Sequence, residues 1–490
     1  MRQSGILLHI SSLPTEFGIG DFGPSAQRFS AYLKREGYSF WQILPINHCG
    51  YGNSPYNPIS AFAISPYLIS PELLFENGLV NRSSLEAAKL PMGDTVFYES
   101  VYKAKDKLLF TAANNWLIAN DVDSFISSEG NRLKPYLAFQ VLSRIYDDNA
   151  WYNWNEEHRC YSETLYQELW KHHATEMQLI AACQCIVRDQ LQQFRNTLAS
   201  DGLSLVGDMP LYLSYESAEV WANRQLFELD DNGLRLSFAG VPPDAFAAEG
   251  QLWGNPIYRW QEMQKDGFQL FFERIAAAMS YIDILRLDHF IGYVNYWRVP
   301  CTYNSSGMPL APSSARDGAW IPALPWDFFE KLCQRFGKQH FIAEDLGILN
   351  EEVCRVRDHF GFPGMIVLQF CFEDSVPRVR EFSADRWLYT GTHDNSTLKG
   401  WYQALPPDSP SIAHLHHYCQ ENSKRDCRQQ ISADNVSRIM RNIAAASSCE
   451  RIIVPFQDIL SFDDSARMNI PGTALGNWQW RIDTTVVLPF

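Results

Sequence analysis

The amino-acid sequence predicts an α/β protein formed by one elaborated (β/α)8 (TIM) barrel over residues 1–490. It also predicts large insertions after the second and third strands and no C-terminal β-sandwich domain. Three features of the chain predict this fold. Short apolar runs recur eight times, turn residues and helical stretches follow these runs, and four of the runs end in acidic residues. Repeated strand–helix units of this kind pack as a parallel sheet covered by helices.

The eight apolar runs are interpreted as strands because they are short, continuous and bounded by turn residues. Runs such as Ile6-Leu7-Leu8 and Ile452-Ile453-Val454 suit strands that are buried on both faces, as in a parallel sheet. In chain order, the predicted strands are Gly5–Ile10, Phe40–Ile46, Leu203–Met209, Ile282–His289, His340–Asp345, Met365–Phe372, Trp387–Thr392 and Arg451–Phe456.

Helical stretches separate these runs. The predicted helices include Ala26–Glu36, Cys183–Leu198, Phe268–Ser280, Trp326–Phe336 and Asn435–Ala446. Because crossovers between parallel strands are right-handed, such a repeat leads either to a doubly wound sheet or to a barrel. Eight units favour the barrel.

The longest gaps between predicted strands separate the second strand from the third and the third from the fourth. Residues 65–200 are predicted to form a mainly helical insertion subdomain, and residues 212–265 a loop-rich insertion. The second insertion contains a stretch rich in glycine and proline, Gly240–Pro256. Both insertions leave the carboxyl ends of barrel strands, where barrel enzymes place their active sites.

Composition excludes several classes of partner. The net charge of −15 disfavours nucleic acid and anionic membranes, because both are bound through clusters of Lys and Arg. Eleven cysteines without CxxC pairs indicate reduced thiols in a cytoplasmic protein, with no metal site. No secretory signal is recognised at the N-terminus, and no apolar run reaches the length of a membrane span.

Acidic residues stand at the carboxyl ends of four predicted strands: Asp208, Asp288, Glu344 and Asp394. A barrel aims these strand ends at one central pocket, so the four acids should converge. A single one of them could cap a helix or form a salt bridge. Gathered carboxylates repel one another and lose hydration, so four together indicate chemistry rather than structural support.

Cleavage of a glycosidic bond needs such an arrangement. A retaining enzyme uses one carboxylate as nucleophile and one carboxylic acid that protonates the leaving oxygen, with the two carboxyls about 5–5.5 Å apart. Arg286, two residues before Asp288, faces the same side of its strand and could keep that carboxylate ionised.

Longer motifs extend this pattern along the whole chain and are weakest in the helical insertion. They are Gly5–Pro14 with Gly18–Asp21, Trp41–Pro45, Gly50–Tyr56 with Ser60–Ala63, Gly207–Trp221, Gly240–Tyr258, Arg286–Phe290, Ile342–Gly347, Gly361–Gln369, Tyr389–Trp401 and Gln457–Trp480. In these motifs the chain resembles glycoside hydrolase family 77 of the α-amylase clan. The members of that family are amylomaltases, also called disproportionating enzymes or 4-α-glucanotransferases.

The resemblance implies a role for each matched residue. Asp288 matches the family's nucleophile, Glu344 its acid/base and Asp394 the carboxylate that stabilises the transition state. The matched residues expected to bind the sugar are Tyr56, Asp208, Arg286 and His393, with Ser54 beside them in the Ser-Pro-Tyr motif. The loop Gly240–Pro256 resembles the family's lid over the glucan. Trp253 and Tyr51 are expected to stack on glucan rings, and Phe246 to shield the site. Ile291 departs from the family pattern, which has Arg at this position.

The resemblance implies transfer of α-1,4-glucan segments between maltooligosaccharides, or glycogen or starch dextrins, without a cofactor. An α-glucan hydrolase of the same clan remains an alternative, because the same acids serve whether water or a sugar hydroxyl attacks the intermediate. A non-catalytic glucan-binding protein is a further alternative. Retention of Asp288, Glu344 and Asp394 together argues against it, because binding alone does not need all three.

Overall fold

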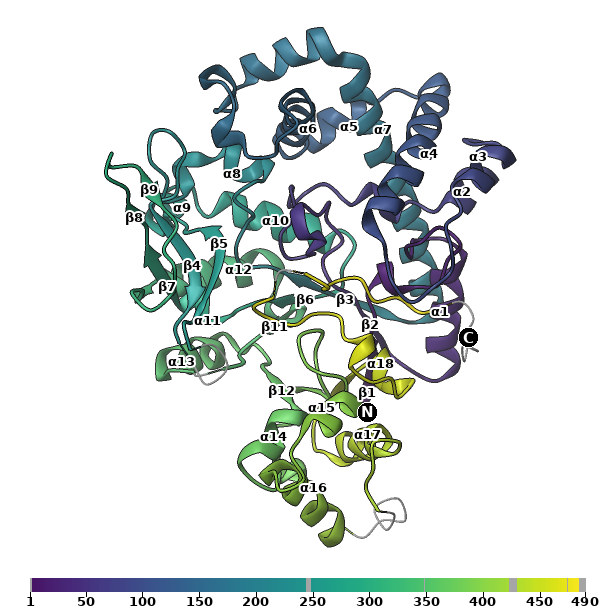
Figure 1. The fold of residues 1–490 in the computed structure, drawn as a ribbon, viewed down its shortest axis with the longest axis vertical. Coiled ribbons are helices and arrows are strands. Elements are labelled where there is room, and N and C mark those ends of the chain that lie inside the picture. The colour runs from purple at the N-terminus through teal and green to yellow at the C-terminus, as the bar shows by residue number, and fades with distance from the viewer. Residues whose placement is uncertain (1, 244–247, 348, 423–429, 474, 484–490) are drawn as a thin grey trace.

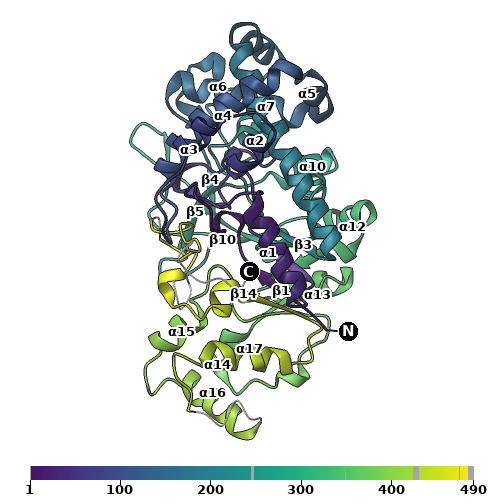
Figure 2. The ribbon, with the colours of Figure 1, turned by 90° about the vertical axis from the view of Figure 1, so that its right-hand side faces the viewer.

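The structure is a computed structural model that describes residues 2–243, 248–347, 349–422, 430–473 and 475–483. Its centre is an eight-stranded sheet in which every pair of neighbouring strands is parallel. The strands are β1 (Gln3–Leu7), β2 (Phe40–Gln42), β3 (Ser204–Met209), β6 (Ile284–Leu287), β11 (Phe341–Ala343), β12 (Met365–Val367), β13 (Trp387–Tyr389) and β14 (Arg451–Pro455). Figures 1 and 2 show this sheet in the middle of the molecule.

The sheet is nearly closed into a barrel, which confirms the predicted fold class. Its order is β11-β6-β3-β2-β1-β14-β13-β12, so β11 and β12 are the two edges that meet at the seam. One backbone hydrogen bond crosses the seam, from the Ala343 amide to the Pro363 carbonyl (2.9 Å). The buried Asp345 carboxylate crosses it too, since it accepts from the Met365 amide (2.7 Å).

Each predicted strand overlaps an observed strand, but the observed strands are shorter, and β1 begins two residues earlier than predicted, at Gln3. The prediction Met365–Phe372 is wrong after Val367, where helix α14 (Leu368–Asp374) begins. Gly5–Ile10 ends as a strand at Leu7, and Phe40–Ile46 at Gln42. The apolar runs continue past the strand ends because the loops that follow are themselves buried, as Ile43, Leu44 and Ile46 are. Burial therefore extends the apolar pattern beyond the hydrogen-bonded ladder.

The five predicted helices are confirmed, as α1 (Pro24–Arg35), part of α7 (Glu163–Asp201), α10 (Gln269–Met279), α12 (Pro325–Phe336) and α17 (Val436–Ala446). The ends of α7 show why the sequence folds in this way. The Ser162 side chain accepts a hydrogen bond from the Leu165 amide at the N-terminus. Gly202 ends the helix with φ of 72°, a left-handed conformation that favours glycine.

Helices also occupy the chain between β2 and β3. They are α2 (Pro71–Glu76), α3 (Arg82–Ala87), α4 (Tyr98–Ala119), α5 (Asp123–Glu129), α6 (Lys134–Tyr146) and α7. Helices α4 and α6 pack against α7 at the upper end of Figure 1. Figures 1 and 2 show α14, α16 (Pro410–Glu421) and α17 at the opposite end of the molecule. Among the described residues, no helix combines the length and the apolar character needed to cross a membrane.

A second, antiparallel sheet was not predicted from the sequence. Its strands, in the order β10-β7-β4-β5, are β10 (Ala319–Pro322), β7 (Asn295–Pro300), β4 (Ser237–Val241) and β5 (Gln251–Pro256). Strands β4 and β5 lie in the segment expected to be rich in loops, and β7 and β10 follow the fourth barrel strand, β6. This sheet lies beside the barrel at the left of Figure 1. It brings the β5 strand to the carboxyl end of β6.

Candidate active site

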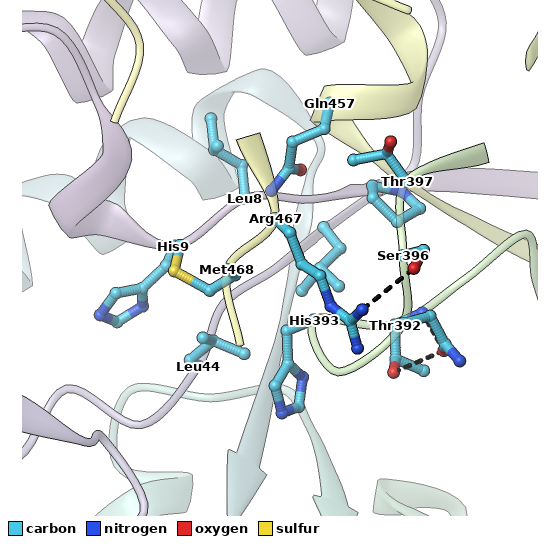
Figure 3. A pocket seen from close by; sticks show the side chains of 13 residues that line it. Leu8, His9, Leu44, Thr392, His393, Ser396, Thr397, Gln457, Arg467 and Met468 are labelled. Carbon is cyan, nitrogen blue, oxygen red and sulfur yellow. Dashed lines mark hydrogen bonds between the residues drawn. The ribbon is translucent and has the colours of Figure 1, made fainter. Parts of the chain in front are cut away.

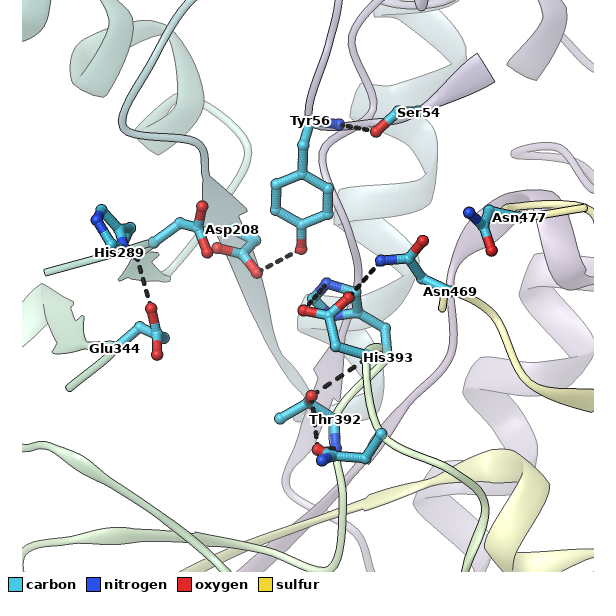
Figure 4. Close-up of polar contacts among 12 residues, drawn as sticks. Ser54, Tyr56, Asp208, His289, Glu344, Thr392, His393, Asn469 and Asn477 are labelled. Atoms are coloured by element: carbon cyan, nitrogen blue, oxygen red, sulfur yellow. Dashed lines mark hydrogen bonds and ion pairs between the residues drawn. The ribbon is translucent and has the colours of Figure 1, made fainter. Parts of the chain in front are cut away.

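A chain of hydrogen bonds joins four predicted site residues at the carboxyl ends of β3 and β6, and Figure 4 shows its link between Tyr56 and Asp208. The Tyr56 hydroxyl donates to Asp208 Oδ2 (2.9 Å). Arg286 Nη1 donates both to Asp208 Oδ2 (2.6 Å) and to Asp288 Oδ1 (2.9 Å). Asp208 and Arg286 are buried, whereas 26% of the Asp288 side chain remains exposed. Asp288 is therefore the carboxylate of this chain that a ligand can reach.

Burial and the neighbouring charges together set the pKa values of Arg286 and Asp288. Burial lowers the pKa of the Arg286 guanidinium, but the carboxylates of Asp208 and Asp288 outweigh it and raise that pKa well above its ordinary value. Burial raises the pKa of Asp288, Arg286 lowers it, and the negative charges of Asp208 and Asp394 raise it again. The result is about 7, so Asp288 can ionise at neutral pH with Arg286 as its partner.

Glu344 follows β11 and is held by backbone amides rather than by a cation. Its Oε2 accepts from the His289 amide (2.8 Å), and its Oε1 from the Leu346 amide (3.1 Å). Burial raises the pKa of Glu344 to about 8 against the opposing effect of Arg286, and the negative charge of Asp288 contributes to the rise. Of the two carboxyls, Glu344 thus holds its proton more strongly, because the arginine contacts Asp288 directly.

Asp394 lies in the loop after β13, beside His393. Its Oδ1 accepts from Asn469 Nδ2 (2.6 Å), and its Oδ2 lies 3.3 Å from His393 Nε2. The His393 ring is buried and stacks on the Tyr56 ring, with centroids 5.0 Å apart and planes at 16°. Burial lowers the pKa of His393 more than the neighbouring Asp394 raises it. Tyr56 therefore connects this carboxylate to the Asp208 cluster.

The structure describes the remaining predicted binding residues to different extents. The Ser54 hydroxyl accepts from the Tyr56 amide (3.2 Å), so its contact is with the loop that carries Tyr56. Trp253 lies on β5 with 37% of its surface exposed, and its ring meets the His289 ring edge-on at 4.8 Å. The backbone of Tyr51 is in a 3-10 turn, Tyr51–Asn53, and its side chain lies outside the description. Phe246 falls outside the described residues.

Several residues of the site were missed in the sequence. Asn469 contacts the Asp394 carboxylate, Arg467 donates to the Asp394 carbonyl (2.6 Å), and Trp478 packs against Tyr56 and His393. All three missed residues belong to the stretch Gln457–Trp480, which carries the family motif. The match of this stretch to the family could have pointed to these residues. The stretch contains no barrel strand, so a structural role in the barrel does not account for the match.

A cavity of about 420 Å³ lies next to the site (Figure 3). It shares His393 with the site and is also lined by His9, Thr392 and Arg467, whose Nη1 donates to the Ser396 hydroxyl (3.0 Å). None of Asp288, Glu344 and Asp394 lines it. Residues of the loop that carries Asp394, from Thr392 to Thr397, line this cavity.

An eight-stranded parallel barrel with an arginine-paired carboxylate and a carboxyl of raised pKa at its carboxyl end is typical of enzymes that act on glycosidic bonds. Comparisons with known proteins narrow this class. A family model described as 4-alpha-glucanotransferase matches residues 8–485. The chain belongs to that family, glycoside hydrolase family 77, and is an enzyme of the amylomaltase type.

Individual relatives cover nearly the whole chain. The 4-alpha-glucanotransferase of Aquifex aeolicus is 36% identical over 98% of this chain and 96% of its own length. The enzyme of that name from Streptococcus pneumoniae serotype 4 is 34% identical, over 100% of this chain and 94% of its own. The solved amylomaltase of Streptococcus agalactiae in complex with acarbose superposes with a TM-score of 0.89 at 29% identity, covering 99% of this chain and 96% of the other.

Proposed function

We propose that this enzyme transfers α-1,4-glucan segments by a double displacement that retains the α-configuration. Asp288 attacks the anomeric carbon and forms a covalent glycosyl-enzyme, while Glu344 protonates the departing glucan oxygen. The 4-hydroxyl of an acceptor glucan then attacks the same carbon, losing its proton to Glu344 and releasing Asp288. Asp394 stabilises the positive charge that develops on the sugar ring in both transition states.

The observation that carries this proposal is the difference between the surroundings of Asp288 and Glu344. A nucleophile must be ionised, and Asp288 has the Arg286 guanidinium 2.9 Å away. A general acid must hold a proton near neutral pH, and burial raises the pKa of Glu344 to about 8 without a cation in direct contact among the described residues. A carboxylate in contact with an arginine, beside a buried carboxyl held by backbone amides, is the pattern of a nucleophile and an acid.

The other residues of the site are proposed to hold the sugar at the scissile bond. Tyr56 and His393 offer a stacked pair of rings, and Asp208 and Arg286 offer a charged hydrogen-bonding edge. Trp253, with one third of its surface exposed, is proposed to stack on a neighbouring glucose ring. Ser54 and Tyr51 belong to the same loop as Tyr56 and are proposed to extend the binding surface along the glucan.

The substrates are proposed to be maltooligosaccharides and the dextrins of glycogen or starch. The amylomaltase of Streptococcus agalactiae has been solved with acarbose, and this chain matches it over 99% of its length. Residues 65–200 are proposed to form a helical subdomain, and residues 212–265 to include the lid over the glucan. A cytoplasmic location is proposed from the eleven scattered cysteines, which form no CxxC pair in the sequence.

Trapping the glycosyl-enzyme tests the assignment. Glu344→Gln should react with α-maltosyl fluoride, because fluoride leaves without protonation, and should then stall, because no base activates the acceptor. Mass spectrometry of a digest should find a maltosyl group on the peptide that contains Asp288. A label on another residue, or no label with fluoride still released at the wild-type rate, would contradict the proposed roles.

A further inference from the structure

His289 has an unusual backbone conformation beside the two catalytic carboxyls. It follows Asp288 directly, and its φ of 50° lies in the left-handed region. Residues other than glycine rarely adopt this region, although His, Asn and Asp do so more often than the rest. Such a conformation costs free energy and persists only where the surroundings enforce it.

The left-handed turn lets two successive amides, those of His289 and Phe290, reach the proposed acid/base. At the end of β6 the Asp288 amide donates to the Met209 carbonyl (3.2 Å), as a strand residue would. One residue later the His289 amide donates to Glu344 Oε2 (2.8 Å), and the Phe290 amide donates to the Glu344 carbonyl (3.0 Å). The left-handed turn thus ends the strand and gives Glu344 a hydrogen bond to its side chain (Figure 4).

Packing of the imidazole holds the turn in place. The ring meets the Trp253 ring edge-on, with centroids 4.8 Å apart and planes at 87°. On another side lies Gly292, where a Cβ atom would stand 2.7 Å from His289 Cδ2 and 2.4 Å from Leu211 Cδ2. Only glycine leaves room for the ring there. Trp253 belongs to β5, which leads out of the proposed lid, so the ring links that strand to the acid/base.

The imidazole itself is not placed as an acid or base. Burial lowers the pKa of His289 to about 4, so the ring is neutral at physiological pH. Its Nε2 is buried and has no hydrogen-bond partner among the described residues. The part of His289 that contacts Glu344 is the backbone amide, and the ring contacts Trp253 and lies close to Gly292.

We propose that His289 is a positioning residue, whose left-handed backbone, fixed by packing between Trp253 and Gly292, holds its own amide and the Phe290 amide against Glu344 and so orients the general acid/base. This inference rests on the proposed role of Glu344. It also links β5 to the position of the acid/base, because loss of the Trp253 ring would remove a packing contact of the His289 ring.

Two substitutions separate the backbone role from the ring. His289→Asn and His289→Val both remove the imidazole, but asparagine tolerates a positive φ whereas β-branched valine does not. On maltotriose, His289→Asn should stay within about tenfold of the wild-type kcat/KM, since its amide can still reach Glu344. His289→Val should lose about 10²-fold or more, since general acid–base catalysis contributes roughly 10²–10⁴-fold.

A second substrate distinguishes misplacement of the acid from general damage. In α-maltosyl fluoride the C1–F bond breaks as Asp288 attacks, and fluoride leaves with the electron pair without needing Glu344. First-turnover fluoride release by His289→Val should therefore stay within about tenfold of the wild type, well short of its loss on maltotriose. Equal losses on both substrates would overturn the proposal, and so would equal losses for the Asn and Val variants.

The pH profile gives a third readout. The His289 amide lowers the pKa of Glu344, and the charged groups that also act on Glu344 are Arg286 and Asp288. The basic limb of kcat/KM should move to higher pH in His289→Val and stay in place in His289→Asn. An unmoved basic limb in a folded Val variant would contradict the proposal.

If His289→Val does not fold, the pair His289→Gly and His289→Ala makes the same comparison, because glycine adopts positive φ freely and alanine does not. Glycine should then retain more activity on maltotriose than alanine, and the reverse order would overturn the proposal. Glu344→Gln is the control for the underlying assignment. If Glu344→Gln stays active, the proposed function fails; if it is inactive and the paired variants behave alike, only the role of His289 fails.

Discussion

Replacing Arg286 with methionine should lower the stability of the fold and raise the pKa of the nucleophile, because both depend on the same two contacts. The guanidinium is buried and its Nη1 lies 2.6 Å from Asp208 Oδ2 and 2.9 Å from Asp288 Oδ1. Methionine keeps much of the volume but leaves two carboxylates without a cation. Removing one partner of a buried ion pair typically costs about 3–5 kcal/mol of unfolding free energy, because the other charge stays buried.

The effect on catalysis follows from the pKa of Asp288. Two unit charges about 4 Å apart interact by about 4 kcal/mol at an effective dielectric constant of about 20, which corresponds to about three pKa units. Since Arg286 lowers the pKa of Asp288, its loss raises that pKa. The acidic limb of kcat/KM for maltotriose should therefore move up by at least about one unit, and each unit costs about tenfold in rate below it.

The assay is the pH dependence of kcat/KM together with urea unfolding at the same pH values. Arg286→Lys is the matched control, because it keeps the charge but not the planar fork that meets both carboxylates. The lysine variant should move the acidic limb less than the methionine variant. An acidic limb that stays in place in a folded methionine variant would refute the view that Arg286 keeps the nucleophile ionised.

Further predictions concern the acids, the lid and the seam. Asp288→Asn and Glu344→Gln should each abolish turnover on maltotriose while the fold survives; a rate above about a tenth of the wild type in either would be too high for an essential group. Glu344→Gln should also gain stability relative to the wild type between about pH 5 and about pH 9 in thermal unfolding. The reason is that the wild-type carboxyl stabilises the fold fully only below its unfolded pKa of 4.5 and loses this contribution as pH rises through about 8. Trp253→Ala should lower transfer more than hydrolysis, measured as new reducing ends per disproportionation event, and an unchanged ratio would remove its proposed stacking role. Asp345→Asn should lower the urea-unfolding free energy by about 3–5 kcal/mol, because the buried Asp345 carboxylate pairs with Arg357 and Arg386, each at 2.6 Å, and both lose their charge partner; a loss below about 1 kcal/mol would contradict that role.

The barrel could be predicted because its strands are buried on both faces. A strand buried on both faces needs apolar residues at consecutive positions, and this pattern is visible locally in runs such as Ile452-Ile453-Val454. Exact strand ends could not be read in this way, since buried loop residues such as Leu44 obey the same requirement. The second sheet was missed because its strands are short and pair across long stretches of chain, with Phe238 opposite Val299 in β7 and opposite Pro256 in β5.

The acids of the site were predictable from their position at strand ends, but their partners were not. Asp288, Glu344 and Asp394 each follow a predicted strand, so one rule about barrels places them together. Asn469 contacts Asp394 from a distant part of the chain, and His289 contributes a backbone amide. A hydrogen bond from a backbone amide depends on φ and ψ and not on residue type, so the residue letter carries little information about it.

The central claim is that the enzyme transfers glucan segments rather than hydrolysing them. Incubation of the purified wild-type enzyme with maltotriose, with products separated by chromatography and reducing ends counted, tests this claim most directly. Each transfer breaks one glycosidic bond and forms another, so glucose and longer maltooligosaccharides should accumulate while the number of reducing ends stays constant. Reducing ends that rise in step with product formation, without longer chains, would show a hydrolase and contradict the account.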